Sequence, residues 1–251
     1  MNNTIYYIKP TKNDFPEAIK DGLLKAFIIL KEKGYCNIKF VLNNSSLIDS
    51  PPNFISEAFD KMVPGQGGNF VNQLRKNRSL SLPGIPIAQQ TTVINLLLSN
   101  NNPSFTNEQT VILLLWADED SFKKVQSSLF FTEVDLVAVV FNETTILNEL
   151  ISASKGIRYP EGLTDTNVNP YTNTFTQQVN DILNRLKGIN VTSFASNNFT
   201  RELMSNVIDE LKRNHLEVSY VDFLGFLVNE VNFPLKESVE LLNWKQRYFG
   251  R

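Results

Sequence analysis

Two apolar runs in the middle of the chain constrain the fold more than any other feature of the sequence. Thr110–Trp116 (TVILLLW) and Asp135–Phe141 (DLVAVVF) are almost wholly hydrophobic. Strands with this pattern are buried on both faces, as in a parallel sheet that is covered by helices on each side. Each run is followed by polar residues that can cap a helix, beginning at Asp118 and at Asn142. These successive strand and helix units predict an α/β fold with a doubly wound, mainly parallel, Rossmann-like sheet.

The first forty residues show the same arrangement. The sequence predicts a strand over Thr4–Lys9, a helix between Asp14 and Gly34, and a second strand over Asn37–Leu42. Asp14 suits the start of this helix and Gly34 suits its end. A strand, a helix and a strand within so few residues form a βαβ unit, whose strands are parallel and whose crossover is right-handed.

The segment from residue 44 to residue 108 is less regular. Helices are expected over Phe54–Met62 and Phe70–Arg75. We expect a strand at the start of Ile85–Leu98, although that segment also allows a helix, and a polar loop over Asn100–Asn107.

The chain becomes helical after about residue 160. Apolar residues recur every three or four positions in the four segments Phe175–Leu186, Phe199–His215, Val221–Val228 and Leu235–Tyr248. The sequence therefore predicts a Rossmann-like α/β domain over residues 1–160 and a helical C-terminal domain over residues 161–251.

Composition excludes several classes of function. The 251 residues carry a formal net charge of −2, so no general attraction to nucleic acid or to an anionic membrane is expected. No apolar stretch is long enough to span a bilayer. The single cysteine, Cys36, and the single histidine, His215, allow neither an intrachain disulfide nor a Cys/His zinc site. The N-terminus lacks the pattern of a signal peptide, and the abundance of Asn and Lys is typical of an AT-rich genome; we expect a cytoplasmic bacterial protein.

The common catalytic and nucleotide-binding motifs are missing from the sequence. It contains neither the GxGxxG fingerprint nor the GxxxxGK[ST] P-loop, and neither GxSxG nor HExxH. His215 lies in the helical segment, far from any nucleophile elbow. Cys36 precedes the second predicted strand, whereas ligands bind beyond the carboxyl ends of strands.

Polar residues at these carboxyl ends form the first candidate site. If the strands are neighbours, their following side chains meet at one edge of the sheet. Asp118 and Asp120 are suited to bind Mg²⁺ through oxygen atoms or to act as a general base. The same residue types are also ordinary helix caps. The candidate ligand-binding residues at this edge are Asn43, Asn44, Asp118, Asp120 and Asn142.

A glycine-rich segment forms the second candidate site. Gly65, Gly67 and Gly68 precede a predicted helix, whose first backbone N–H groups are able to hold a phosphate. Surface turns have the same composition, so a purely structural role is the alternative. This segment is the basis for predicting a small phosphorylated ligand.

Trp244 and Tyr248 share one face of the last predicted helix. They are suited either to packing that helix on its own domain or to a homodimer contact through the C-terminal helices. Three functions stay open: a non-catalytic module that binds a ligand or a protein, an enzyme acting on a nucleotide or phosphorylated metabolite, and a homo-oligomerising structural subunit. Cofactors and substrate are not indicated by the sequence.

Overall fold

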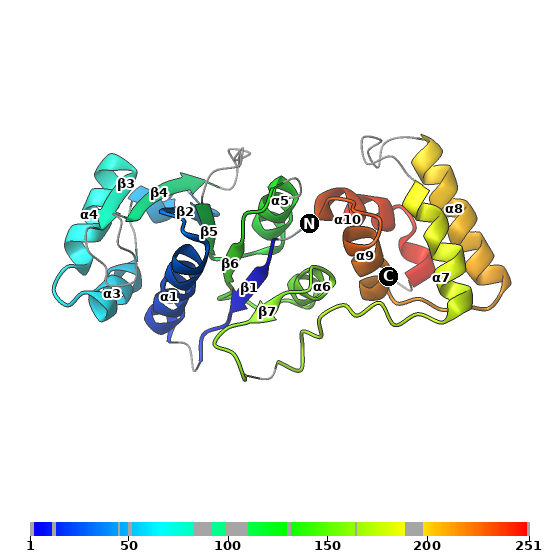
Figure 1. Cartoon of the computed structure of the whole chain (residues 1–251), viewed down its shortest axis with the longest axis horizontal. Helices are drawn as coiled ribbons and strands as arrows, with labels where there is room; N and C mark the ends of the chain where they lie inside the picture. The colour runs from blue at the N-terminus through cyan, green and yellow to red at the C-terminus, as the bar shows by residue number, and fades with distance from the viewer. Residues whose placement is uncertain are drawn as a thin grey trace. The chain divides into compact units, whose positions relative to one another are not determined.

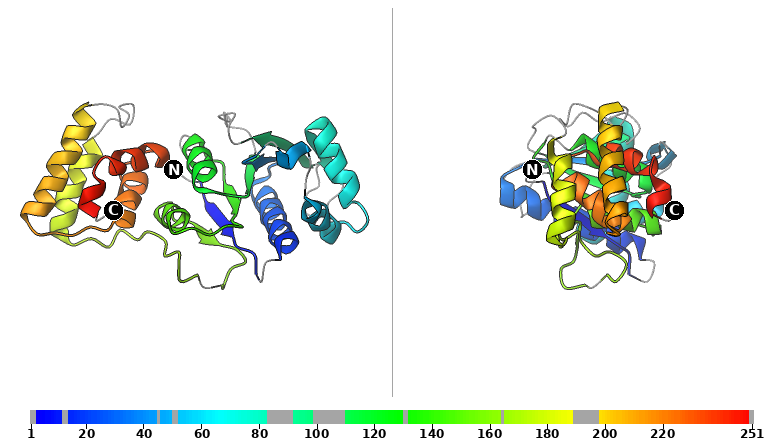
Figure 2. Two further views of the ribbon diagram at one scale, coloured as in Figure 1. Left: turned by 180° about the vertical axis from the view of Figure 1, so that it is seen from behind. Right: turned by 90° about the vertical axis from the view of Figure 1, so that its right-hand side faces the viewer.

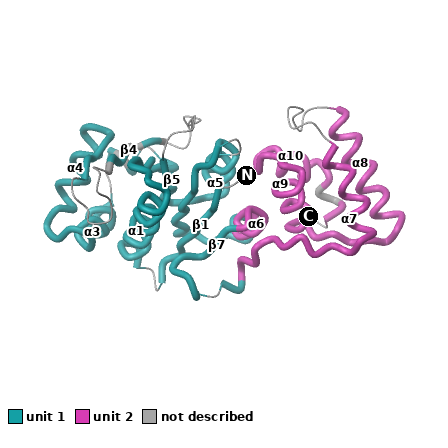
Figure 3. The backbone as a smooth tube through the Cα atoms, viewed as in Figure 1, with its two compact units in different colours: residues 1–147, 156–166 teal, residues 148–155, 167–251 magenta. Residues whose placement is uncertain are grey.

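The chain forms two compact units in the computed structural model (Figure 3). The first comprises residues 1–147 and 156–166, and the second comprises residues 148–155 and 167–251. The residues described are 3–11, 14–44, 46–49, 52–82, 92–98, 110–129, 132–163, 165–188 and 198–249.

The first unit is built on a seven-stranded sheet with the order β3-β4-β2-β5-β6-β1-β7 (Figure 1). All neighbouring strands are parallel except β3 and β4, which are antiparallel. The predicted α/β fold with a mainly parallel sheet is confirmed. The strands are β1 (Ile5–Ile8), β2 (Asn37–Leu42), β3 (Ser79–Leu82), β4 (Thr92–Leu98), β5 (Thr110–Leu115), β6 (Leu136–Val139) and β7 (Ile157–Arg158).

Helices cover both faces of this sheet. The connections from β1 to β2 and from β5 to β6 run in opposite directions across it, so right-handed crossovers place α1 and α5 on opposite faces. In both views α3 lies beside α1, and α4 lies beside α3 (Figures 1 and 2). The helices of the first unit are α1 (Phe15–Lys33), α2 (Ser46–Asp49), α3 (Asn53–Met62), α4 (Gly67–Asn77) and α5 (Glu119–Ser128). A further helix, α6 (Thr145–Ala153), starts in the first unit, and its residues from Asn148 onward belong to the second.

The first βαβ unit forms as its capping residues predict. The Asp14 carboxylate accepts a hydrogen bond from the backbone N–H of Glu17 at 3.0 Å, which starts α1. Gly34 ends the helix in the left-handed conformation (φ 68°), and its N–H bonds to the carbonyl of Leu30. Glycine adopts this conformation without the steric penalty of a side chain.

The central strands are the core of the first unit. All six residues of β5 and all four residues of β6 are buried. Each large apolar side chain buried in this way stabilises the fold by about 1.5–3 kcal/mol relative to an exposed one. The unbroken apolar runs therefore formed the central strands because helices shield them on both sides.

The segment between β2 and β5 differs in part from the expectation. The predicted helix over 54–62 is present as α3. The next helix, α4, starts at Gly67 rather than near Phe70, so Gly67 and Gly68 lie in its first turn and not in a loop. The short antiparallel edge strand β3 was not predicted. β4 lies in the second half of the segment Ile85–Leu98. The strand predicted at the start of that segment, over residues 85–91, and the predicted loop over Asn100–Asn107 lie outside the described residues.

The second unit is helical, as its sequence pattern predicts. Thr176 and Ser219 cap α7 and α9 by accepting hydrogen bonds from backbone N–H groups. The predicted helix over 235–248 ends at Asn243 and is followed by a 3-10 turn. The elements are α7 (Gln177–Leu183), η2 (Asn184–Gly188), α8 (Asn198–Arg213), α9 (Tyr220–Asn229), α10 (Leu235–Asn243) and η3 (Gln246–Phe249). In the described part of the chain, no helix has both the length and the apolar character to cross a membrane.

Candidate functional site

The sheet has a topological switch point between β2 and β5. From β2 the chain moves toward β4 on one side, and from β5 it moves toward β6 on the other. Open α/β sheets bind ligands in the crevice beyond the carboxyl ends of two such strands. Asn43 directly follows β2, and Trp116 and Asp118 follow β5. The switch point is therefore the first place to look for a binding site.

Asn43 and Asp118 are joined across this switch point. The Asn43 amide nitrogen donates to Asp118 Oδ2 at 2.8 Å. Asp118 Oδ1 accepts from the backbone N–H of Ser121 at 2.7 Å, and the Asp118 N–H donates to Ser121 Oγ at 3.0 Å. These last two bonds form a capping box at the start of α5. Asp118 thus caps its helix and also belongs to a polar pair at the edge of the sheet.

Hydrogen bonding sets the charge state of Asp118. Burial alone raises the pKa of this carboxyl group, but the bonds from Ser121 and Asn43 outweigh burial and hold the pKa below its usual value. Asp118 is therefore a carboxylate at neutral pH, and it accepts hydrogen bonds.

The sequence also predicted Asn44, Asp120 and Asn142 as ligand-binding residues at this edge of the sheet. Asn44 accepts a hydrogen bond from the N–H of Ser46 at 2.9 Å within its own turn. Asp120 is exposed and forms an ion pair with Lys123 at 3.0 Å. Asn142 follows β6 and is exposed. The structure brings Asn43 and Asp118 together, whereas Asn44 and Asp120 engage neighbours in their own segments.

Of the three glycines in the predicted phosphate site, Gly67 has a role in helix packing. Gly65 takes a left-handed turn conformation (φ 76°), and the N–H of Gly67 donates to Asp60 Oδ1 at 2.6 Å. A Cβ atom at Gly67 would overlap the backbone carbonyl oxygen of Ser56 in α3. Gly68 is exposed and has open space around its Cα atom. Gly67 is therefore needed where α3 and α4 approach each other.

Three helix starts in the first unit already hold a carboxylate of the chain itself. Asp14 accepts from α1, Asp60 accepts from α4 and Asp118 accepts from α5. A helix N-terminus attracts anions, and here each of these starts is occupied by one. A phosphate placed beside them would meet a like charge, so the local electrostatics disfavour the predicted phosphorylated ligand. That prediction stays open to experiment.

Four aromatic rings from separate segments meet near the switch point. The Trp116 ring lies 4.9 Å from that of Phe54 and 4.5 Å from that of Phe141, measured between centroids. Phe15 lies 5.0 Å from Phe141. Each of the four is only partly buried, so each presents some surface to solvent. These four residues form the aromatic cluster, which the sequence analysis did not predict.

The backbone of Trp116 is strained. Its φ of 56° lies in the left-handed region, which costs a bulky residue about 1–2 kcal/mol. Strained residues persist where the surrounding structure holds them, and they are frequent at functional sites. Here the strained backbone stands between the last residue of β5 and Asp118, and it carries the ring that contacts both Phe54 and Phe141.

An ionic network in which the Lys9 and Asp165 side chains are largely buried lies at the ends of β1 and β7. Lys9 Nζ is 2.7 Å from Glu143 Oε1 and 2.7 Å from Asp165 Oδ2. The hydroxyl of Tyr7 donates to the same Asp165 oxygen at 3.2 Å. Burial and the nearby Asp165 raise the pKa of Tyr7 well above its usual value. The network holds residue 165 against β1. Lys9 is the last residue of the predicted strand Thr4–Lys9, and the sequence pattern did not predict its ionic role.

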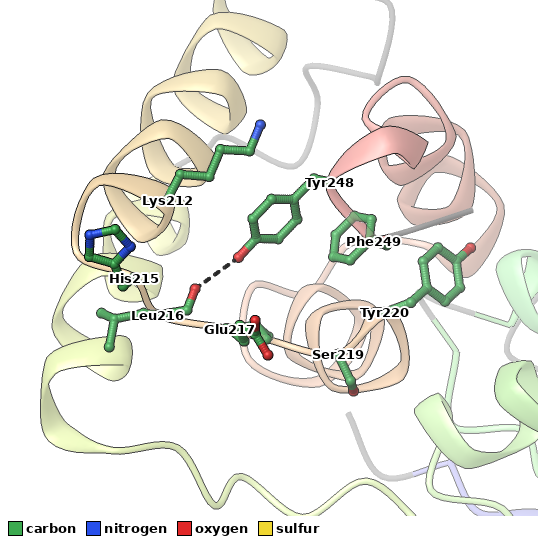
Figure 4. Close-up of a pocket in the computed structure, with 9 residues that line it drawn as sticks. Lys212, His215, Leu216, Glu217, Ser219, Tyr220, Tyr248 and Phe249 are labelled. Carbon is green, nitrogen blue, oxygen red and sulfur yellow. Dashed lines mark hydrogen bonds between the residues drawn. The ribbon is translucent and has the colours of Figure 1, made fainter.

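A cavity of about 680 Å³ lies in the second unit, between the loop after α8 and η3 (Figure 4). The Tyr248 hydroxyl donates to the carbonyl of Leu216 at 3.2 Å across it. His215, which adopts a left-handed conformation (φ 56°), is part of its rim. The lining residues are Lys212, His215, Leu216, Glu217, Val218, Ser219, Tyr220, Tyr248 and Phe249.

Metal ligands and similarity to known proteins are two further sources of evidence on function. Among the residues that the structure describes, no three His, Cys, Asp or Glu side chains are grouped so that they could hold a metal ion. No protein-family model, no curated protein and no solved structure matches the chain significantly. A function for this protein can therefore be inferred only from the geometry of the described residues.

Proposed function

We propose that the protein is a non-catalytic binding protein whose switch point takes an uncharged planar molecule with hydrogen-bond donors, of the nucleoside class. The observation that carries this proposal is the pairing of the aromatic cluster with the Asn43 and Asp118 pair at the carboxyl edge. Rings such as Trp116 offer stacking surface to a planar ligand. The Asp118 carboxylate accepts from hydroxyl or amino groups, and the Asn43 amide supplies both a donor and an acceptor.

The state of Asp118 supports binding over proton transfer. An efficient general base has a pKa near the working pH. The pKa of Asp118 is lowered, and its carboxylate accepts hydrogen bonds from the Asn43 amide and from the Ser121 backbone N–H. A group held in this way is a fixed acceptor, which positions a ligand without exchanging protons at neutral pH.

The charges at this edge support an uncharged ligand. Asp118 stands in the site itself, and Glu119 and Asp120 follow it directly. Asp14 directly precedes Phe15 of the aromatic cluster. Lys61 offsets part of this charge because it pairs with Asp14 at 3.4 Å and with Glu17 at 2.8 Å. A phosphate group would add repulsion, whereas the hydroxyl groups of a ribose would donate to the carboxylates.

The two tryptophans allow a direct test. Trp116 is in the first unit and Trp244 is in the second, so the Trp244→Phe variant reports on the switch point alone by fluorescence. We expect at least one of adenosine, guanosine, cytidine and uridine to change the Trp116 emission in a saturable way. The 5′-monophosphate of the same nucleoside is expected to bind several-fold more weakly.

Matched variants connect that signal to the site. Asp118→Asn is expected to weaken nucleoside binding about tenfold, because it replaces one charged acceptor by an amide. Asp120→Asn is the control, since Asp120 is exposed and pairs only locally with Lys123 in the contacts described. A monophosphate that binds more tightly than its nucleoside, or the absence of any saturable response to the four nucleosides, would contradict the proposal.

A further inference from the structure

Aromatic and basic side chains lie together in two groups on the second unit. Arg201 lies over the Trp244 ring with its Cζ atom 5.9 Å from the centroid, and Lys245 Nζ lies 4.5 Å from the same centroid. Further along α8, Lys212 Nζ is 5.5 Å from the centroid of the Tyr248 ring. These five residues are called the aromatic–basic strip. Trp244 keeps 46% of its surface exposed, which is high for a residue of this size.

The strip leads into the cavity. Lys212 and Tyr248 belong to the strip and also line the cavity of Figure 4. Phe249 packs edge-on against Tyr248, with 4.8 Å between ring centroids, and against Tyr220 at 5.5 Å. The cavity therefore has an aromatic wall with a lysine at its rim. Its volume, about 680 Å³, is in the range of sites that enclose a bound group.

The length of the strip indicates an extended ligand. Arg201 and Lys212 are eleven positions apart on α8, which corresponds to about 16 Å along a helix axis. An extended peptide advances about 3.3 Å per residue, so about five residues span this distance. A nucleoside or another molecule of similar size would cover only one end.

We infer that the second unit binds an extended, acidic peptide segment of a partner protein, with one large apolar side chain of that segment in the cavity. The acidic side chains pair with Arg201, Lys212 and Lys245, and the apolar side chain packs on Tyr248 and Phe249. Aromatic and arginine side chains are the residues that most often dominate such interfaces. This inference concerns the other unit and does not depend on the proposed nucleoside site.

The charge of the cavity favours a peptide over single-stranded nucleic acid. Stacking rings and cations also suit nucleic acid, which carries a phosphate at every nucleotide. Glu217, however, is an exposed carboxylate that lines the cavity. A phosphate backbone would be repelled there, whereas a peptide can turn a backbone N–H toward Glu217 and place its own carboxylates on the lysines.

The test uses the full chain and a labelled probe. Fluorescence anisotropy is measured with a fluorescein-labelled hexapeptide of alternating glutamate and phenylalanine, with a lysine-for-glutamate version, and with a hexamer of thymidylate. We expect saturable binding of the acidic peptide, weaker binding as salt is increased, and no binding of the basic version. Tighter binding of the thymidylate hexamer would overturn the inference in favour of a nucleic-acid site.

Matched variants assign the binding to the strip. Lys212 is exposed, so its replacement should leave the fold intact. Lys212→Ser removes a positive charge and should weaken acidic-peptide binding about threefold to fivefold, and Lys212→Glu, which reverses the charge, should weaken it further. Lys236→Ser, an exposed lysine of α10 that pairs with Glu240, is the control and should leave affinity unchanged. Trp244→Ala should cost about tenfold or more, and Trp116→Phe in the first unit should have no effect. Equal effects of Lys212→Ser and Lys236→Ser, or a dimer in sedimentation that Trp244→Ala converts to monomer, would overturn the inference.

Discussion

The adjacent glycines at the start of α4 give opposite predictions for the same substitution. A Cβ atom at Gly67 would overlap the Ser56 carbonyl oxygen and would lie 2.8 Å from Asp60 Oδ2. The Ser56 oxygen belongs to the backbone, so a change of side-chain rotamer cannot relieve the overlap. The helices α3 and α4 must therefore separate. At Gly68 the added methyl group meets open space. Gly67→Ala is therefore expected to destabilise the first unit, and Gly68→Ala is expected to stabilise it.

The magnitudes follow from the contacts. Overpacking at Gly67 costs about 1–3 kcal/mol, and displacement of the 2.6 Å bond from its N–H to the Asp60 carboxylate adds about 1.5 kcal/mol. We expect a total loss of about 3 kcal/mol in the free energy of unfolding. Gly68→Ala should add about 0.5 kcal/mol, because alanine has less conformational freedom in the unfolded chain.

Urea denaturation of both variants measures the difference. In a Trp244→Phe background, Trp116 fluorescence follows the first unit alone. With a urea m-value of about 2 kcal/mol/M, the midpoint should fall by about 1.5 M for Gly67→Ala and rise slightly for Gly68→Ala. Asp60→Asn, which retains the glycine, separates loss of the charged hydrogen bond from the clash. Equal midpoints for the two alanine variants would refute the close approach of α3 and α4.

Two predictions concern pH and follow from the shifted pKa values of Asp118 and Tyr7, and a third concerns the ion pair of Lys9 with Asp165. The lowered pKa of Asp118 adds stability above the unfolded pKa of about 3.9, and this stability is lost as pH falls through the folded pKa. Asp118→Asn keeps a capping oxygen but loses the charge at the start of α5, so it should flatten the acid limb of a thermal-stability profile and cost about 0.3–1 kcal/mol at pH 7. The raised pKa of Tyr7 adds stability that is complete below about pH 10 and is lost as pH rises toward the folded pKa. Tyr7→Phe should therefore reduce the alkaline loss of melting temperature, and an unchanged alkaline limb would show that another group causes it. Asp165→Ala removes one of the two carboxylate partners of the largely buried Lys9 side chain and leaves Glu143, so it should cost about 1–3 kcal/mol in urea unfolding. A cost below about 0.5 kcal/mol would show that the pair is solvated.

Local features of the fold were predictable from short stretches of sequence. The two apolar runs became β5 and β6, and Asp14 and Asp118 became helix caps. A cap needs only a side chain and the backbone three residues later, and burial of a strand is visible in its own composition. The role of the glycines was not predictable in this way, because a glycine that permits close packing and one that cradles a ligand have the same local sequence.

The candidate site itself required the tertiary structure. Asn43 and Asp118 are 75 positions apart, and they bond because β2 and β5 are neighbours in the sheet. The aromatic cluster draws single rings from four segments, and Lys9 meets Asp165 only because residues 156–166 return to β1. The sequence by itself determined most of the strands and helices, with β3 an exception, since hydrogen bonding and burial within an element act over a few residues. Only the tertiary structure decided the order of the strands in the sheet, and with it which strand ends meet. Strand order depends on packing between distant segments, and such packing leaves no periodic signal in the chain.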